Sequence, residues 1–255
     1  MSRGRDTTAS VETVSLQLRR WVKGRDGTAA DLAYRLVMAI RHAEVPVIQP
    51  LHAPLYYGWL GVTNALAAVT RILWWTPLFK SRLAAPAPRL RLSGGGLPMI
   101  LGPLIIRVGS DCRISAQTTF TGRSAGAEVP HLVVGDNVDI GWQTTIAVGR
   151  RVIIGDNCRI AGRAFLAGYP GHPLDAAARA AGQPETDDQV GDIVLEDDVW
   201  LATGVTVGAG VRIGRGTVVA AGSVVTRDLP AGVLAAGAPA KVVRTIAPGK
   251  NTERR

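Results

Sequence analysis

A histidine in an irregular stretch is the side chain best placed for proton transfer in this sequence. His172 lies between Gly171 and Pro173, in a segment with the composition of a loop. An unperturbed imidazole titrates at about pH 6.5, so it accepts a proton readily near neutrality. The other three histidines, His42, His52 and His131, fit ordinary positions on a helix face or in a loop. His172 is therefore the candidate general base.

Metal chemistry has weak support. Cys112 and Cys158 form no CxxC pair, which predicts two core thiols and neither a zinc site nor a disulfide framework. Clustered acids between residues 185 and 198 are interpreted as solvated loop and corner charges. A zinc-dependent γ-type carbonic anhydrase needs three histidines, and the repeat region described next has only His131 and His172. We predict no metal site.

The sequence on either side of the His172 segment follows a six-residue repeat, so the structure that this repeat forms must position the histidine. Aliphatic residues recur at every sixth position, at Leu195, Leu201, Val207, Ile213, Val219 and Val225. Small or β-branched residues follow four positions later, at Val199, Val205, Val211, Thr217 and Ser223. The same phase restarts three times between residues 104 and 166. A period of six favours short parallel strands wound into a solenoid over helices or a β-sandwich.

The repeat and its interruptions predict a domain organisation. The alanine-rich residues 176–181 predict a short helix inside the largest interruption. The predicted parts are a polar flexible N-terminus at 1–16, a helical, basic and partly hydrophobic region at 17–91, a linker at 92–103, a repeat domain at 104–246 with a loop at 167–192 and a C-terminal cap at 229–246, and a polar tail at 247–255.

Charge and apolar residues are concentrated before the repeats. Residues 1–91 hold 13 Lys and Arg against 5 Asp and Glu, whereas residues 92–255 hold 16 against 15. Within residues 54–79 the only charge is Arg71, among aromatic and aliphatic residues. This pattern predicts contact of residues 54–91 with an anionic membrane surface. Packing against the solenoid end or an oligomer interface, and a spanning helix, are the alternatives.

Partners and location follow from the same distribution. The basic residues bracket an apolar segment and do not line a groove-reading element, so no nucleic-acid partner is predicted. Residues 1–25 are polar and basic without an apolar stretch of signal-peptide length. We expect a cytoplasmic protein, peripheral at the cytoplasmic face of the inner membrane.

Three motifs in order carry a family resemblance. They are the loop from Gly171 to Asp175, the hexamer from Asp198 to Leu201, and the ending from Gly237 to Arg244. With the hexamers, they resemble the hexapeptide-repeat acyltransferases over about residues 104–246, most closely the maltose and galactoside O-acetyltransferase branch. The resemblance implies a mainly β fold, a left-handed parallel β-helix with an α-helical N-terminal region. It also implies a homotrimer with acetyl-CoA, the acyl donor, between neighbouring subunits.

The resemblance also assigns site residues. His172 is the implied general base, acting on a hydroxyl of a saccharide acceptor. The implied acetyl-CoA-binding residues are Trp200, Ala220, Ala221, Gly222, Thr226, Arg227, Lys241 and Arg244. Gln143 and Asp175 are the predicted substrate-binding residues. The family's acceptor-facing asparagine falls where this chain reads Gly141, Trp142 and Gln143, so the acceptor contacts do not transfer directly.

Residues 1–90 also differ from the short helical start of the soluble sugar enzymes. We therefore expect an acceptor other than free maltose or galactoside, such as a lipid-linked saccharide or an envelope polysaccharide. An N-acyltransferase of an amino sugar and a non-catalytic β-helix scaffold or binding module are the rival interpretations.

Overall fold

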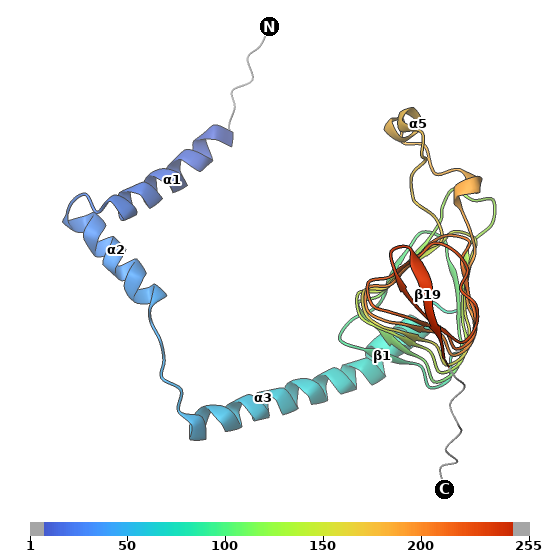
Figure 1. The fold of residues 1–255 in the computed structure, drawn as a ribbon. Coiled ribbons are helices and arrows are strands. Elements are labelled where there is room, and N and C mark those ends of the chain that lie inside the picture. The colour runs from blue at the N-terminus through green and yellow to red at the C-terminus, as the bar shows by residue number, and fades with distance from the viewer. Residues whose placement is uncertain (1–7, 247–255) are drawn as a thin grey trace. The chain divides into compact units, whose positions relative to one another are not determined.

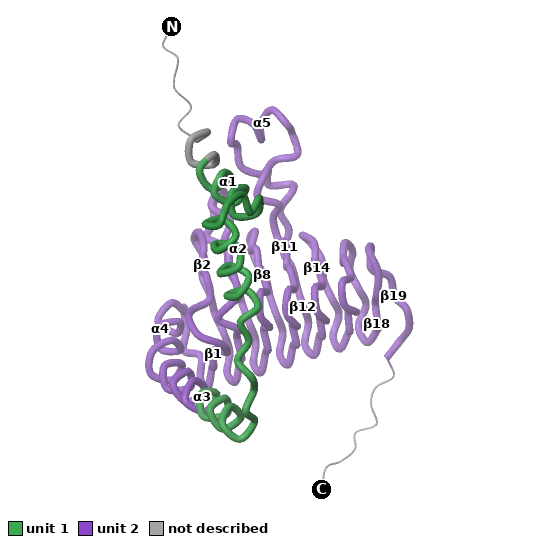
Figure 2. The backbone as a smooth tube through the Cα atoms, turned by 90° about the vertical axis from the view of Figure 1, so that its left-hand side faces the viewer, with its two compact units in different colours: residues 1–60 green, residues 61–255 purple. Residues whose placement is uncertain are grey.

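A computed structural model describes the backbone of residues 8–246, which fall into two compact units divided between residues 60 and 61 (Figure 2). Residues 1–7 of the predicted flexible N-terminus and the predicted tail at 247–255 lie outside the described residues. Helix α1 (Thr8–Gly24) begins inside the segment 1–16 that was expected to be flexible. That part of the prediction is wrong from residue 8 onward.

The first unit is helical. Helices α1 and α2 (Thr28–Arg41) are joined by a short turn. At this turn the Arg25 guanidinium lies 3.9 Å from the centre of the Tyr34 ring. Asp31, in the first turn of α2, pairs with Arg35 at 2.8 Å. Helix α3 (Gln49–Thr70) crosses from the first unit into the second. The described helices contain no stretch long and apolar enough to cross a membrane.

The second unit is a parallel β-helix whose coils visit three sheets in turn, which gives the triangular outline in Figure 1. Sheet A contains β1 (Arg91–Ser93), β4 (Arg113–Ser115), β7 (Asp139–Ile140), β10 (Arg159–Ile160), β13 (Trp200–Leu201), β16 (Val218–Val219), β18 (Val233–Gly237) and β19 (Ala240–Thr245). Sheet B contains β2 (Met99–Leu101), β5 (Thr119–Gly122), β8 (Thr145–Val148), β11 (Phe165–Ala167), β14 (Thr206–Val207) and β17 (Val224–Val225). Sheet C contains β3 (Ile105–Val108), β6 (His131–Val134), β9 (Arg151–Ile154), β12 (Ile193–Leu195) and β15 (Arg212–Ile213).

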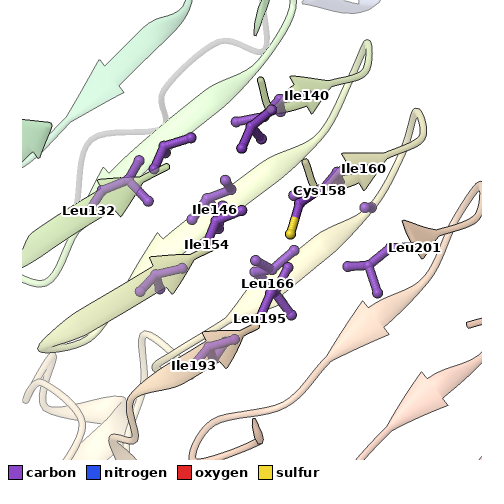
Figure 3. Close-up of a cluster of buried hydrophobic side chains, with 14 of the residues drawn as sticks. Leu132, Ile140, Ile146, Ile154, Cys158, Ile160, Leu166, Ile193, Leu195 and Leu201 are labelled. Carbon is purple, nitrogen blue, oxygen red and sulfur yellow. The ribbon is translucent and has the colours of Figure 1, made fainter. Parts of the chain in front are cut away.

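The hexapeptide phase places the aliphatic residues inside the β-helix. Leu195, Leu201 and Val207 are completely buried, as are the three aliphatic residues that continue the series. Successive coils stack these side chains in rows, as Figure 3 shows for Ile140, Ile160 and Leu201. Each coil buries too little apolar surface to be stable alone, so the stack of coils supplies the stability. The predicted fold class, a left-handed parallel β-helix with an α-helical N-terminal region, is confirmed.

Asparagine and aspartate form the corner between sheets C and A. Asn137, Asn157 and Asp198 have φ values of 54°, 59° and 61°, a left-handed conformation that these residue types tolerate better than most. Their side chains continue the stack, because the Asn137 amide donates to Asn157 at 2.9 Å and the Asn157 amide donates to Asp198 at 3.1 Å.

The β-helix starts earlier than its predicted first residue, 104. Strands β1 and β2 lie within or at the edge of the predicted linker 92–103, and they pair in register with β4 and β5. The linker prediction is therefore wrong, because this first coil lacks the hexapeptide spacing that marks the later ones. A π-helical turn, η1 (Arg71–Trp75), and α4 (Thr76–Lys80) precede this coil. Phe79 of α4 is buried and stacks on Phe120 at 6.3 Å between ring centroids, so this helix covers the core at the first coil.

Two additions complete the β-helix. At its C-terminal end β19 turns back antiparallel onto β18. Between β11 and β12 the loop 168–192 projects from the stack, with α5 (Ala176–Ala180) near its tip and the 3-10 turn η2 (Asp187–Gln189) near its base (Figures 1 and 2). Helix α5 confirms the short helix predicted from the alanine-rich stretch.

Candidate active site

His172 is exposed on the projecting loop, which leaves sheet B after β11 and returns to sheet C at β12. A loop that turned freely would hold an imidazole poorly, so the contacts that fix the loop determine what His172 can do. Several of these contacts involve side chains.

The base of the loop is held by a buried ion pair. The Arg123 guanidinium, which follows β5, donates to the Glu185 carboxylate at 2.5 Å and to the Glu185 carbonyl at 3.1 Å. Both side chains are 5% exposed. Arg123 also pairs with the exposed Asp187 at 2.6 Å. Burial by itself lowers the pKa of Arg123, but the carboxylates of Asp187 and Glu185 together raise that pKa above its ordinary value.

Residues on either side of His172 are also fixed. The hydroxyls of Tyr169 and Thr121 share a hydrogen bond of 2.8 Å, which ties the first part of the loop to sheet B. On the other side, the Arg179 guanidinium donates to the carbonyls of Pro173 and Leu174 at 2.8 and 3.0 Å. The Pro173 side chain is buried. His172 is thus an exposed imidazole on a backbone constrained from both directions.

Asp175 has a structural role in this loop. Its carboxylate accepts a hydrogen bond of 2.7 Å from the Ala178 N–H and forms the N-cap of α5. The predicted contact of Asp175 with substrate has no counterpart in this geometry and stays a prediction.

Trp200 lies on sheet A, in β13, with its side chain 50% exposed. Its neighbours on the adjacent strands are Arg159 and Val218, and its sequence neighbours Val199 and Leu201 point into the core. An indole that is half-exposed on a rigid strand offers an apolar surface to a ligand.

The corner between sheets A and B gathers a second group of predicted residues. Ala220, Ala221 and Gly222 form its turn after β16, and Gly222 has a φ of 68° with open space around the position of an added Cβ. This small, exposed turn allows close approach of a ligand to the backbone. Gln143 occupies the same corner three coils earlier, after β7.

Two residues that sequence reasoning did not assign join Gln143 there. The Arg163 guanidinium lies 4.8 Å from the centre of the Trp142 ring and donates to the Gln143 amide oxygen at 3.2 Å. Gln143 and Arg163 have φ values of 55° and 62°, whereas later coils place glycine in the left-handed position of this corner. The signal that could have found Arg163 is a long polar side chain where the repeat otherwise uses glycine. An indole, a guanidinium and an amide side by side suit stacking and hydrogen bonding with a polar ring.

The remaining predicted residues are basic or polar and exposed. Thr226 and Arg227 follow β17 at the corner between sheets B and C. Lys241 and Arg244 lie on β19. Their charges are available to phosphate groups.

The predicted site is spread over several sides of one chain. The histidine loop leaves the corner between sheets B and C, Trp200 is on sheet A, and Gly222 is at the corner between sheets A and B. Across residues 8–246, no hydrogen bond or ion pair joins His172 to another predicted site residue.

Three of the clustered acids form ion pairs along sheet C. Asp192 pairs with Arg151 at 2.9 Å, Glu196 with Arg212 at 2.5 Å and Asp197 with Arg215 at 2.5 Å. These carboxylates therefore serve as ion-pair partners at the two edges of sheet C, Asp192 before β12 and the other two after it. His131, at the start of β6, lines a cavity of about 710 Å³ over sheet C, together with Arg150 and Asp192.

Comparison with known proteins agrees with this fold. Residues 192–227 match the bacterial transferase hexapeptide family, described as six repeats. The chain therefore carries a hexapeptide-repeat β-helix of the kind found in bacterial transferases.

Two proteins with similar sequences indicate which branch of these transferases the chain resembles. Galactoside O-acetyltransferase of Escherichia coli K12 is 36% identical over 132 residues, which cover 49% of this chain and 63% of that protein. A Saccharomyces cerevisiae protein with a provisional acetyltransferase name is 38% identical over 116 residues, which cover 46% of this chain and 57% of that protein. The chain thus spans about three fifths of the length of these relatives. These matches confirm the resemblance to the galactoside branch.

Solved structures with a similar fold include an enzyme of a different acyl-transfer class. This example is a variant of an N-acyltransferase from Bacillus cereus in complex with dTDP and coenzyme A, with a TM-score of 0.53 and 17% sequence identity. The superposition covers 68% of this chain and 89% of that one. At this identity the likeness concerns the fold alone.

Proposed function

We propose that this protein is a coenzyme A-dependent O-acetyltransferase that moves the acetyl group of acetyl-CoA to a hydroxyl of a saccharide. The observation that carries the proposal is the exposed imidazole of His172 on a loop fixed by the buried Arg123–Glu185 pair. The sequence similarity to galactoside O-acetyltransferase supports the choice of a hydroxyl acceptor.

His172 is the general base in this proposal. The imidazole takes the proton of the acceptor hydroxyl while the oxygen attacks the thioester carbonyl carbon. A tetrahedral oxyanion forms, and a backbone N–H facing it would stabilise its charge. The intermediate collapses, the carbon–sulfur bond breaks, and the imidazolium returns the proton to the leaving thiolate. The products are an acetyl ester and free coenzyme A.

The other predicted residues bind the two substrates. Trp200 and the small turn at 220–222 would hold the acyl end and pantetheine arm of acetyl-CoA. Arg227, Lys241 and Arg244 would meet its phosphates, with Thr226 beside them. The Trp142–Arg163–Gln143 cluster is the acceptor-side candidate, because its stacked and hydrogen-bonded groups suit a sugar ring.

The homotrimer is proposed from the resemblance to hexapeptide-repeat acyltransferases, and the spread of these residues supports a site shared between copies. One chain places the histidine loop and Trp200 on different sides of the β-helix, so a neighbouring copy has to complete the site. We propose that acetyl-CoA lies between two copies, and that the reaction takes place in the cytoplasm. Light scattering of the purified protein tests the trimer directly.

The experiment that tests the function uses the full chain, labelled acetyl-CoA and a panel of sugars, glycolipids and polysaccharides. We expect His172→Ala to lower kcat by about 10² to 10⁴, the usual contribution of general base catalysis. His131→Ala is the matched control, because it removes the other histidine of the repeat domain, and its kcat should be unchanged. Mild alkali distinguishes the ester product from the amide of an N-acyltransferase.

Two results would contradict the proposal. If the folded His172→Ala protein transfers acetyl groups as fast as the parent, His172 is not the base. If titration calorimetry detects no binding of coenzyme A, the β-helix is a scaffold or binding module and not an acyltransferase.

A further inference from the structure

We propose that Arg71, Arg91 and Arg113 form a binding site for the headgroup phosphate of an anionic phospholipid. The site lies in the second unit, at the junction of the π-helical turn and the first coil. In this proposal the apolar helix surface that leads into the same turn inserts into the same lipid layer. Vesicle binding does not require acetyl transfer, so the proposal stands apart from the proposed function.

The three arginines line one cavity, although they are far apart in the sequence. The cavity has a volume of about 280 Å³, and Leu92 and Ser93 complete its wall. Arg91 and Arg113 are register partners in the parallel pairing of β1 with β4. Arg71 begins the π-helical turn η1, which contacts β1. The volume corresponds to roughly nine water molecules of liquid, enough for a phosphate group.

The local charge favours an anion. Arg113 is neutralised by Asp139 at 2.8 Å, and the nearby Asp111 is held by Arg89 through bonds of 2.6 and 2.5 Å. In the described part of the chain, no carboxylate lies within ion-pair distance of Arg71 or Arg91. The cavity therefore presents two unneutralised guanidinium groups, whose planar donor geometry suits phosphate oxygens.

The helix that precedes Arg71 carries an exposed apolar face. On the part of α3 in the second unit, Val62, Leu66 and Val69 follow a spacing of four and three residues, so they share one helix face. Each is more than half exposed. In η1 and α4, Leu73, Trp74 and Leu78 are exposed as well, whereas Trp75 and Phe79 pack against the β-helix core.

These two features together identify a lipid surface as the partner. Apolar insertion combined with attraction of basic residues to anionic headgroups is how interfacial helices bind membranes. A symmetric contact with a second copy would bring the same unneutralised arginines together and is disfavoured by their charge. The excess of 13 basic over 5 acidic residues in residues 1–91 acts in the same direction.

Co-sedimentation of the full chain with vesicles tests the proposal. We expect binding to vesicles of phosphatidylcholine with phosphatidylglycerol, and much weaker binding to phosphatidylcholine alone. Arg91→Gln should weaken binding to the anionic vesicles about fivefold, from about 1 kcal/mol per basic residue at the surface. Arg71→Gln should act equally. Arg107→Gln is the matched control: it removes the same charge from an exposed position of β3 and should change binding less than twofold. Leu73→Ser should weaken binding to both kinds of vesicle.

Three outcomes would overturn the proposal. Equal losses in Arg91→Gln and Arg107→Gln would mean that net charge, and not the cavity, attracts the lipid. If the parent stays in the supernatant with both vesicles and its self-association is lost in Leu73→Ser, a second copy covers the apolar surface. If excess inorganic phosphate raises the Tm of the parent but not of Arg91→Gln, and no vesicle is bound, the cavity takes a soluble phosphate compound. Unchanged circular dichroism confirms that each variant is folded.

Discussion

The buried Arg123–Glu185 pair should determine whether the histidine loop keeps its position. Both side chains are 5% exposed, whereas the second partner of Arg123, Asp187, is 83% exposed. Arg123→Met keeps much of the apolar stem but leaves the Glu185 carboxylate buried without its cation. Removing one partner of a buried pair typically costs about 3 to 5 kcal/mol, because the other charge stays desolvated. Detachment of the loop would relieve this cost, because Glu185 would then reach water.

The matched variant removes the exposed partner. Asp187→Asn breaks an ion pair that solvent screens, so we expect a cost of about 0 to 1 kcal/mol. Hydrogen exchange of the backbone amides in residues 169–190 measures local opening of the loop. We expect Arg123→Met to speed this exchange by about 10² or more, while the amides of the β-helix strands keep their protection.

Activity gives a second measurement of the same perturbation. In Arg123→Met, kcat for acetyl transfer should fall because the imidazole is displaced, while the KM for acetyl-CoA changes little because its predicted contacts lie outside the loop. The reasoning would be refuted if Arg123→Met and Asp187→Asn changed loop exchange equally, or if Arg123→Met left both exchange and kcat unchanged.

Two further predictions concern the core and the acyl-donor side. Burial raises the pKa of the Cys158 thiol from 9.0 to about 11. The unfolded chain therefore loses this proton first as pH rises, and the free energy of unfolding should fall by about 2 kcal/mol between pH 9 and 11. Urea titrations should show a smaller fall in Cys158→Ala. Trp200→Ala should weaken coenzyme A binding about tenfold, which is about 1.4 kcal/mol, with little change in the free energy of unfolding. Trp142→Ala removes a similarly exposed indole and is the control. If calorimetry gave equal losses of coenzyme A affinity for the two variants, the assignment of Trp200 to the acyl-donor site would be contradicted.

The features that depend on short-range sequence patterns, namely the β-helix, helix α5 and the histidine loop, were predictable from the sequence. The β-helix requires an inward aliphatic residue at each sixth position, so Leu195 and Leu201 identify the fold without knowledge of any contact. The same holds for the short helix α5, which depends only on its alanines and on the Asp175 cap. The loop carrying His172 was predictable as the largest break in the period.

The first coil was not predictable in this way. Its strands β1 and β2 lack the six-residue spacing and are defined by pairing with β4 and β5. The π-helical turn likewise depends on packing, because Trp75 and Phe79 must face the core while their neighbours face outward.

The sequence by itself determined the repeat, the fold and the identity of the candidate base, because each of these depends on residue type and short spacing. Only the tertiary structure placed Arg123 against Glu185, 62 positions away, and Arg163 against Trp142 on the adjacent coil. It also brought Arg71, Arg91 and Arg113 to one cavity. The physical reason is that stacking of coils joins residues one full turn or more apart, and the length of each turn varies with the loops that interrupt the period.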